Sequence, residues 1–119
     1  MGQQASISGV QLPPASRVSL KIEIDSEVNI TAFVARQKAN RFLIMEAGDQ
    51  LMADQPALHI ADALYWRVPI QFAPSRQGAL GVVGHLLVDA QTGDVRIADG
   101  VTVSELLDRA DALNARTTL

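Results

Sequence analysis

The sequence predicts an α+β protein built on an antiparallel sheet of four to five strands. Three patterns support this fold class. A helical stretch follows a first alternating segment, further alternating segments are joined by short turns, and a capped amphipathic helix comes last. The predicted order is β-α-(β)-β-β-β-α, with a long N-terminal helix and a C-terminal amphipathic helix. Strands joined by tight turns pair in antiparallel fashion, so a parallel α/β sheet is the less natural interpretation.

The length and composition fit one domain. A chain of 119 residues with 48% hydrophobic residues can bury a single core without cross-links. We expect this domain to span residues 17–116. Residues 1–16 are rich in Gln, Ser, Gly and Pro, which is typical of a flexible N-terminal tail. The absence of cysteine excludes disulfides, thiolate metal sites and cysteine nucleophiles.

The charge and hydropathy of the chain limit the classes of partner that we expect it to bind. The formal net charge of −3 disfavours nucleic acid, because phosphate-driven binding needs a dense field of Lys and Arg. The sequence contains no apolar run of the length that a membrane-spanning helix requires. Residues 1–16 contain neither Lys nor Arg nor a continuous apolar stretch, so no export signal is indicated. We therefore expect a soluble, cytoplasmic protein.

The first two elements follow from their periodicity. Residues 18–25 alternate strictly between apolar and polar side chains, as a half-buried strand does. The stretch Asn29–Leu51 lacks this alternation and is predicted as a long helix. Its run Phe42–Met45 also fits a short buried strand, and Gly48 costs about 1 kcal/mol in a helix interior. The predicted inner face comprises Ala32, Ala35, Ala39, Phe42, Leu43 and Glu46, and the predicted outer face Arg36, Gln37, Lys38, Asn40 and Arg41.

A proline complicates the strongest strand signal. After a break at residues 54–56, Leu58–Ile60 fits a short strand, and Leu64–Phe72 then places five apolar side chains on one face. Pro69 cannot donate a hydrogen bond to a neighbouring strand. The sequence therefore predicts that Leu64–Phe72 lies at an edge of the sheet, or that Pro69 lies at a bulge.

A meander and a helix complete the prediction. Ala79–Asp89 is apolar on both faces, which favours a central strand. Residues 90–93 form a predicted tight turn with Gly93 left-handed, and a strand at Asp94–Ala98 follows. The last helix, Thr102–Asn114, begins at a capping box formed by Thr102 and Glu105. Its predicted inner face comprises Val103, Leu106, Leu107, Ala110 and Leu113, and its predicted outer face Glu105, Asp108, Arg109 and Asp111.

No complete catalytic or metal-binding constellation is visible. His59 and His85 lie in no motif that aims two imidazoles at one metal, and no serine occupies a nucleophile elbow. Asp89 and Asp94 flank a turn, where local hydrogen bonding favours Asp. Gly78, Gly81 and Gly84 recur in strand-like sequence and indicate bulges, bending or close approach of a helix, not a phosphate cradle. We therefore predict a protein that is not an enzyme and uses neither metal nor cofactor.

Two surfaces are candidates for binding. If Trp66 is buried, Tyr65 and Arg67 share the opposite face of their strand, and tyrosine and arginine are favoured in protein recognition. His85 lies on the second face of the following strand. The cations on the long helix could contact an acidic partner or only be solvated: Arg36, Lys38 and Arg41.

Two segments carry a resemblance to a known family. The segment Tyr65–Ile70 reads YWRVPI and Val88–Val95 reads VDAQTGDV. Residues 65–95 resemble the C-terminal half of a PepSY-type domain, in which a helix precedes an antiparallel hairpin ending in a V-D-A-x-T-G-x-V signature. The resemblance implies the local β-β fold and a small non-catalytic module that binds or restrains another protein.

These observations lead to a first hypothesis of a non-enzymatic module that binds another protein or a second copy of itself. An edge strand that pairs across a two-fold axis would support a homodimer. The alternative is a small-molecule-binding protein or simple enzyme with a pocket between the long helix and the sheet, lined by His85, Tyr65 or Arg67. A DNA-binding regulator is a third, weaker hypothesis, which the acidic balance disfavours.

Overall fold

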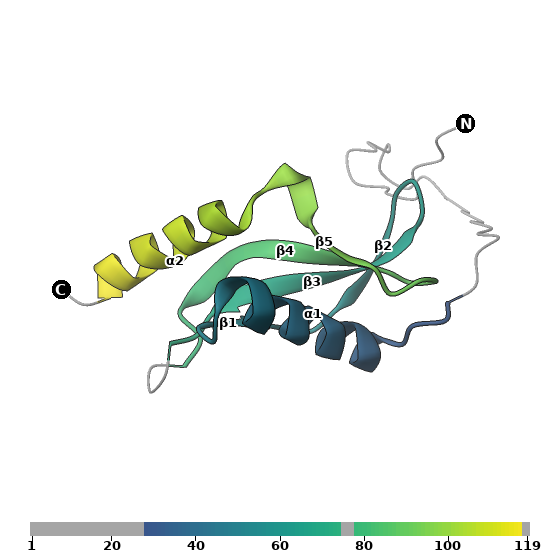
Figure 1. The fold of residues 1–119 in the computed structure, drawn as a ribbon, viewed down its shortest axis with the longest axis horizontal. Helices are drawn as coiled ribbons and strands as arrows, with labels where there is room; N and C mark the ends of the chain where they lie inside the picture. The colour runs from purple at the N-terminus through teal and green to yellow at the C-terminus, as the bar shows by residue number, and fades with distance from the viewer. Residues whose placement is uncertain (1–27, 75–77, 118–119) are drawn as a thin grey trace, which may run out of the picture.

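The computed structural model describes residues 28–74 and 78–117. It shows an α+β fold with a curled antiparallel sheet, and along the chain one helix precedes the strands and another follows them (Figure 1). The predicted fold class is confirmed. The predicted tail and the predicted strand at residues 18–25 lie outside the described residues. The elements are α1 (Ala32–Ala47), β1 (Leu51–Ala53), β2 (Ala57–Ile60), β3 (Leu64–Phe72), β4 (Gly81–Asp89), β5 (Val95–Ile97), the 3-10 turn η1 (Ala98–Gly100) and α2 (Val103–Thr117).

Strand β3 is the interior strand on which the sheet is built. It pairs with β4 on one side, while β1 and β2 share its other side. β1 lies opposite Ile70–Phe72 and β2 opposite Leu64–Arg67. The prediction that Leu64–Phe72 is an edge strand is therefore wrong. The prediction that the next strand is central is confirmed, since β4 pairs with both β3 and β5.

Pro69 fits this interior position because of a gap between two neighbours. Its carbonyl accepts a hydrogen bond from the Asp54 N–H at 2.9 Å. The N and O of one strand residue point to the same side, so the proline nitrogen also faces residues 54–56, where β1 has ended and β2 has not begun. At this position no neighbouring strand requires a backbone N–H from residue 69. A register shift between Ile70 and Gln71 follows directly, so the predicted bulge lies next to the proline.

Helix α1 is shorter than predicted at both ends. Thr31 begins it, with its Oγ1 accepting a hydrogen bond from the Val34 N–H at 3.2 Å. Gly48 ends it with a φ of 96°, a conformation that favours glycine. The run 42–45 is therefore helical, whereas Leu51 belongs to β1 and pairs with Phe72. The N–H of the Trp66 indole donates to the Ile30 carbonyl at 2.6 Å and fixes the start of the helix on β3.

Both helices bury their apolar side chains on one face of the sheet, which we call the helix-covered face. In β3 this face carries Trp66, Val68, Ile70 and Phe72. The predicted inner face of α1 is right for its small residues and for Leu43, but Glu46 is exposed. Small side chains let the helix lie close to the strands. The buried helix residues in this core are Ala35, Ala39, Leu43, Leu106 and Ala110.

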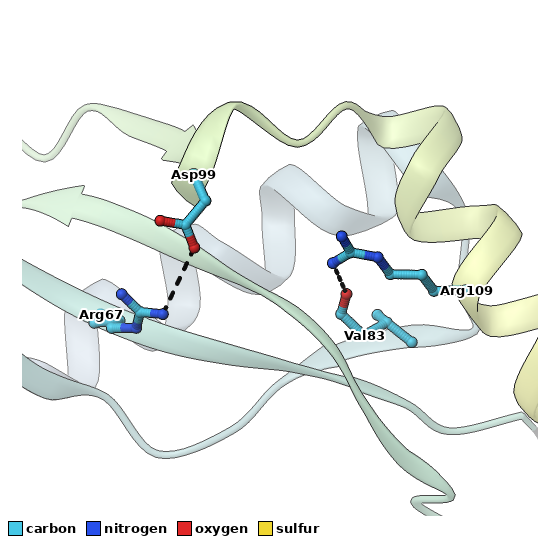
Figure 2. Close-up of polar contacts among 4 residues, drawn as sticks. All are labelled: Arg67, Val83, Asp99 and Arg109. Atoms are coloured by element: carbon cyan, nitrogen blue, oxygen red, sulfur yellow. Dashed lines mark hydrogen bonds and ion pairs between the residues drawn. The ribbon is translucent and has the colours of Figure 1, made fainter.

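Two glycines of β4 admit α2 onto the sheet. A Cβ at Gly84 would lie 2.6 Å from the Leu106 Cδ2, and one at Gly81 would lie 3.1 Å from the Leu113 Cδ1. The expected close approach of a helix is confirmed, and α2 covers its own sheet. Arg109, predicted to face outward, donates from Nη1 to the Val83 carbonyl at 2.8 Å (Figure 2). This bond satisfies the carbonyl of Val83, the β4 residue that has no partner in the register with β3.

The two predicted capping and turn motifs are confirmed. The Glu105 N–H donates to the Thr102 Oγ1 at 3.1 Å, and the Thr102 N–H donates to the Glu105 Oε1 at 3.4 Å. The helix then continues past Asn114 to Thr117. In the turn between β4 and β5, Gly93 has a φ of 81°. Asp89 accepts hydrogen bonds there from the N–H groups of residues 91 and 92, as local turn bonding requires.

We predict that Gly84→Ala lowers the free energy of unfolding by about 1–3 kcal/mol, because the new methyl group meets a fully buried leucine that cannot move aside. Denaturant unfolding measures the loss. Gly81→Ala is the matched control and should cost less, since Leu113 is only partly buried. Shortening the neighbour in a Gly84→Ala, Leu106→Val double variant should cost less than the sum of the two single changes. An additive pair would contradict the close approach.

We predict a pH-dependent stabilisation from Asp89. Hydrogen bonds from the N–H groups of Thr92 and Gln91 hold the pKa of its carboxyl below the ordinary value. A lowered folded-state pKa stabilises the protein above the unfolded pKa of about 4, and this contribution is lost as pH falls through the folded value. The stability difference between wild type and Asp89→Asn should therefore be largest near neutral pH and shrink in acid. A difference that does not change with pH would contradict this assignment.

Candidate functional site

The described residues contain no group of three or more His, Asp or Glu side chains placed to hold a metal ion. His59 lies on β2 opposite Tyr65, and His85 lies on β4 opposite Pro69. None of the helices in residues 28–74 and 78–117 has the length and apolar character to cross a membrane. The features that stand out are two surfaces, one on the sheet and one on α1.

The first surface is the open face of the sheet, opposite the helices. It brings together the three residues that the sequence singled out, Tyr65 and Arg67 on β3 and His85 on β4. Arg96 of β5 joins them, because it pairs with Leu87, which in turn pairs with Arg67. This face has its own small apolar cluster, in which Tyr65 and Leu87 pack with residues of the flanking turns.

Tyr65 is an anchor within this face. Only 8% of the residue is exposed, and its hydroxyl donates to the Asp62 Oδ1 at 3.1 Å and accepts from the Arg96 Nη2 at 3.2 Å. The Arg96 guanidinium also lies over the ring, 5.1 Å from its centroid. Burial is the main cause that raises the pKa of the Tyr65 phenol, and the hydrogen bond to Asp62 raises it further. The ring therefore stabilises the surface instead of standing out from it.

Arg67 and His85 are the accessible parts of the predicted trio. The Arg67 Nη2 lies 3.8 Å from the Asp99 Oδ2, in a solvent-exposed ion pair of the kind that contributes little to stability (Figure 2). Burial, and next the Arg67 charge, lower the pKa of His85 below its usual value. The lowered pKa favours the neutral imidazole at pH 7. Of Arg67 and His85, Arg67 is therefore the side chain that carries a permanent positive charge.

The predicted basic cluster on α1 is divided by the fold. The Arg36 Nε donates to the Ala53 carbonyl at 3.1 Å, and its Nη1 donates to the Gln55 Oε1 at 3.2 Å. Arg36 thus ties α1 to the segment after β1. Lys38 and Arg41 lie on the β5 side of the helix, where they line an open hollow of about 300 Å³ with an apolar wall. That volume is at the lower end of the range for ligand sites.

The second surface is the outer stripe of α1, which we define as Phe33, Lys38, Arg41, Ile44 and Met45. Its three apolar members are 62–71% exposed although they sit on a helix whose other side is fully buried. Sequence analysis did not single these apolar residues out. The available signal was their position on the helical wheel, since all three fall outside the row of Ala35, Ala39 and Leu43.

The sequence also suggested a pocket between α1 and the sheet, with Tyr65, Arg67 or His85 supplying polar groups. Tyr65, Arg67 and His85 lie on the open face, whereas α1 covers the other face. These polar groups therefore do not line the space beneath α1. Sequence analysis also missed their partners Asp62, Arg96 and Asp99, because turns and a separate strand bring these residues in.

Comparison of the chain with protein-family models, curated proteins and solved structures gives no match. The resemblance to PepSY-type domains stays a prediction. Its first segment, residues 65–70, lies within β3, and its second segment, residues 88–95, forms the end of β4, the turn and the start of β5. The functional argument therefore depends on the geometry of the two surfaces.

We predict that the Tyr65 phenol titrates above the ordinary pKa of about 10. The chain contains one tyrosine, so the phenolate absorbance reports on this residue alone. Asp62→Asn removes a charge that raises the pKa and should move the titration down, whereas Arg96→Gln removes a charge that lowers it and should move the titration up. The neutral phenol stabilises the fold below the unfolded pKa, and this contribution is lost as pH rises through the folded pKa. Shifts of the same sign in both variants would contradict the network.

Proposed function

We propose that this chain is a non-enzymatic module that acts by binding protein, and that it binds a second copy of itself as a homodimer. The observation that carries the proposal is the set of large exposed apolar side chains on α1, Phe33, Ile44 and Met45. These side chains extend along the helix, with Phe33 in its first turn and Ile44 and Met45 in its last, and several exposed apolar side chains on one element mark a protein contact surface.

The energetic argument favours a partner for this stripe. Burying one large apolar side chain contributes about 1.5–3 kcal/mol, so three of them on one helix can supply a substantial part of a micromolar affinity of about 8 kcal/mol. The nearby cations add specificity, because neither Lys38 nor Arg41 forms an ion pair with another described residue. A contact surface of this kind has an apolar centre and charges that select the partner.

The dimer is supported by the exposed side chains of α1 and not by an edge strand of the sheet. An edge strand at Leu64–Phe72 would have offered a backbone pairing site, but β3 is interior. The polar groups of the open face are mostly engaged within the chain, as the bonds of Tyr65 to Asp62 and Arg96 illustrate. The PepSY-like hairpin is compatible with a protein-binding role and is part of the same proposal.

We predict that sedimentation velocity of the full chain shows a coefficient that rises with concentration toward that of a dimer. The double variant Phe33→Gln, Met45→Gln should dimerise at least tenfold more weakly, because two buried apolar side chains are lost from the contact. Met52→Gln is the matched control, since Met52 is 41% exposed and pairs with Gln71 on the open-face side of β3. A strict monomer over the whole concentration range would refute the homodimer.

A further inference from the structure

We infer that the dimer forms by docking the outer stripe of α1 against α2 of the second copy, a contact made twice about a two-fold axis. This inference rests on the proposed function and adds the surface and the partner. On α2, the exposed residues Leu107, Asp108 and Asp111 form what we call the acidic stripe. Leu107 is 38% exposed, and both carboxylates are exposed.

The acidic stripe exists because of how α2 packs on its own sheet. Leu106 and Ala110 are buried in the core, and Leu113 covers Gly81. The helical period then turns residues 108 and 111 away from the sheet and leaves residue 107 at the side of the helix. Arg109 reaches back to the Val83 carbonyl, so its guanidinium is held at β4 and does not neutralise the two carboxylates (Figure 2).

The two stripes have matching charges and spacing. Lys38 and Arg41 are three residues apart on α1, and Asp108 and Asp111 are three residues apart on α2. In each helix the two charges are thus separated by about 4.5 Å along the axis. Each pair has apolar neighbours, Leu107 in one case and the side chains of the α1 outer stripe in the other.

Like charges disfavour the simplest alternative. A symmetric contact of α1 with α1 of the second copy would place Phe33 near Met45 at both ends of the contact. Its centre would then bring Lys38 and Arg41 of one copy against the same cations of the other. Juxtaposed like charges disfavour such an interface, whereas α1 against α2 joins opposite charges.

The architecture allows the contact to be made twice. Both helices lie on the helix-covered face, so both stripes lie on that side of the sheet, with Lys38 at the border nearest the β4–β5 turn. A two-fold axis on that side brings α1 of each copy to α2 of the other. The resulting interface is isologous and closed, so it produces a dimer and not a filament.

Charge reversal tests the inference directly. We expect Lys38→Glu, Arg41→Glu to dimerise at least tenfold more weakly than wild type, and Asp108→Lys, Asp111→Lys to do the same. In the first variant both stripes are acidic, and in the second both are basic. An equimolar mixture should therefore form a one-to-one heterodimer with an affinity near that of wild type, which native mass spectrometry distinguishes from the homodimers. Circular dichroism checks that each variant is folded. If the Lys38→Glu, Arg41→Glu variant does not fold, Lys38→Gln, Arg41→Gln replaces it, and we expect weaker dimerisation there as well.

The control and the contradicting results separate this inference from the proposed function. Arg67→Glu reverses a charge on the open face and should leave dimerisation unchanged. If the wild type is a dimer but both reversed variants also dimerise normally, or if mixing restores nothing, this interface is wrong while the dimer stands. Loss of the dimer in Arg67→Glu alone would likewise move the interface to the open face. A monomeric wild type would refute the proposed function itself.

Discussion

The structure depends on the apolar face that β3 and β4 present together. This face carries bulky side chains at alternate positions and can be removed from water only by elements that lie close to it. Both helices pack on this one face, and neither covers the other. The close approach requires small residues at the contacts: Ala35 and Ala39 on α1, and Gly81 and Gly84 on β4. The rest of the surface follows from this one-sided arrangement.

One consequence is that the two faces of the sheet are stabilised differently. The helix-covered face is apolar, while the open face combines a small apolar cluster with a hydrogen-bonded tyrosine and exposed charges. A second consequence is that the outer sides of α1 and α2 point away from the sheet together. The apolar side chains on α1 and the carboxylates on α2 are thus exposed on the helix-covered side of the molecule. The proposed dimer uses that side and leaves the sheet fold unchanged.

Much of the fold could be predicted because it follows from local patterns. Alternation defined the limits of β3, the Thr102–Glu105 pair identified the start of α2, and Gly93 identified a turn. The candidate site was less predictable. Tyr65, Arg67 and His85 do share a face, as alternation along paired strands requires. Arg36 was placed with the other cations, but its role depends on a backbone carbonyl of β1 that is distant in sequence.

The sequence by itself determined the fold class, the order of the main elements and most of the inner residues of each helix, because side-chain periodicity and capping act over a few residues. Glu46 and Leu107 were predicted on the inner faces, but both are exposed. Only the tertiary structure decided that β3 is interior. The reason is that Pro69 faces a gap between β1 and β2, and such a gap depends on how separate segments align. Tertiary structure also decided that Arg109 is bound to β4 and that the outer stripe of α1 is exposed. Periodicity specifies which side of a helix is apolar, but packing decides how much of that side a neighbour covers.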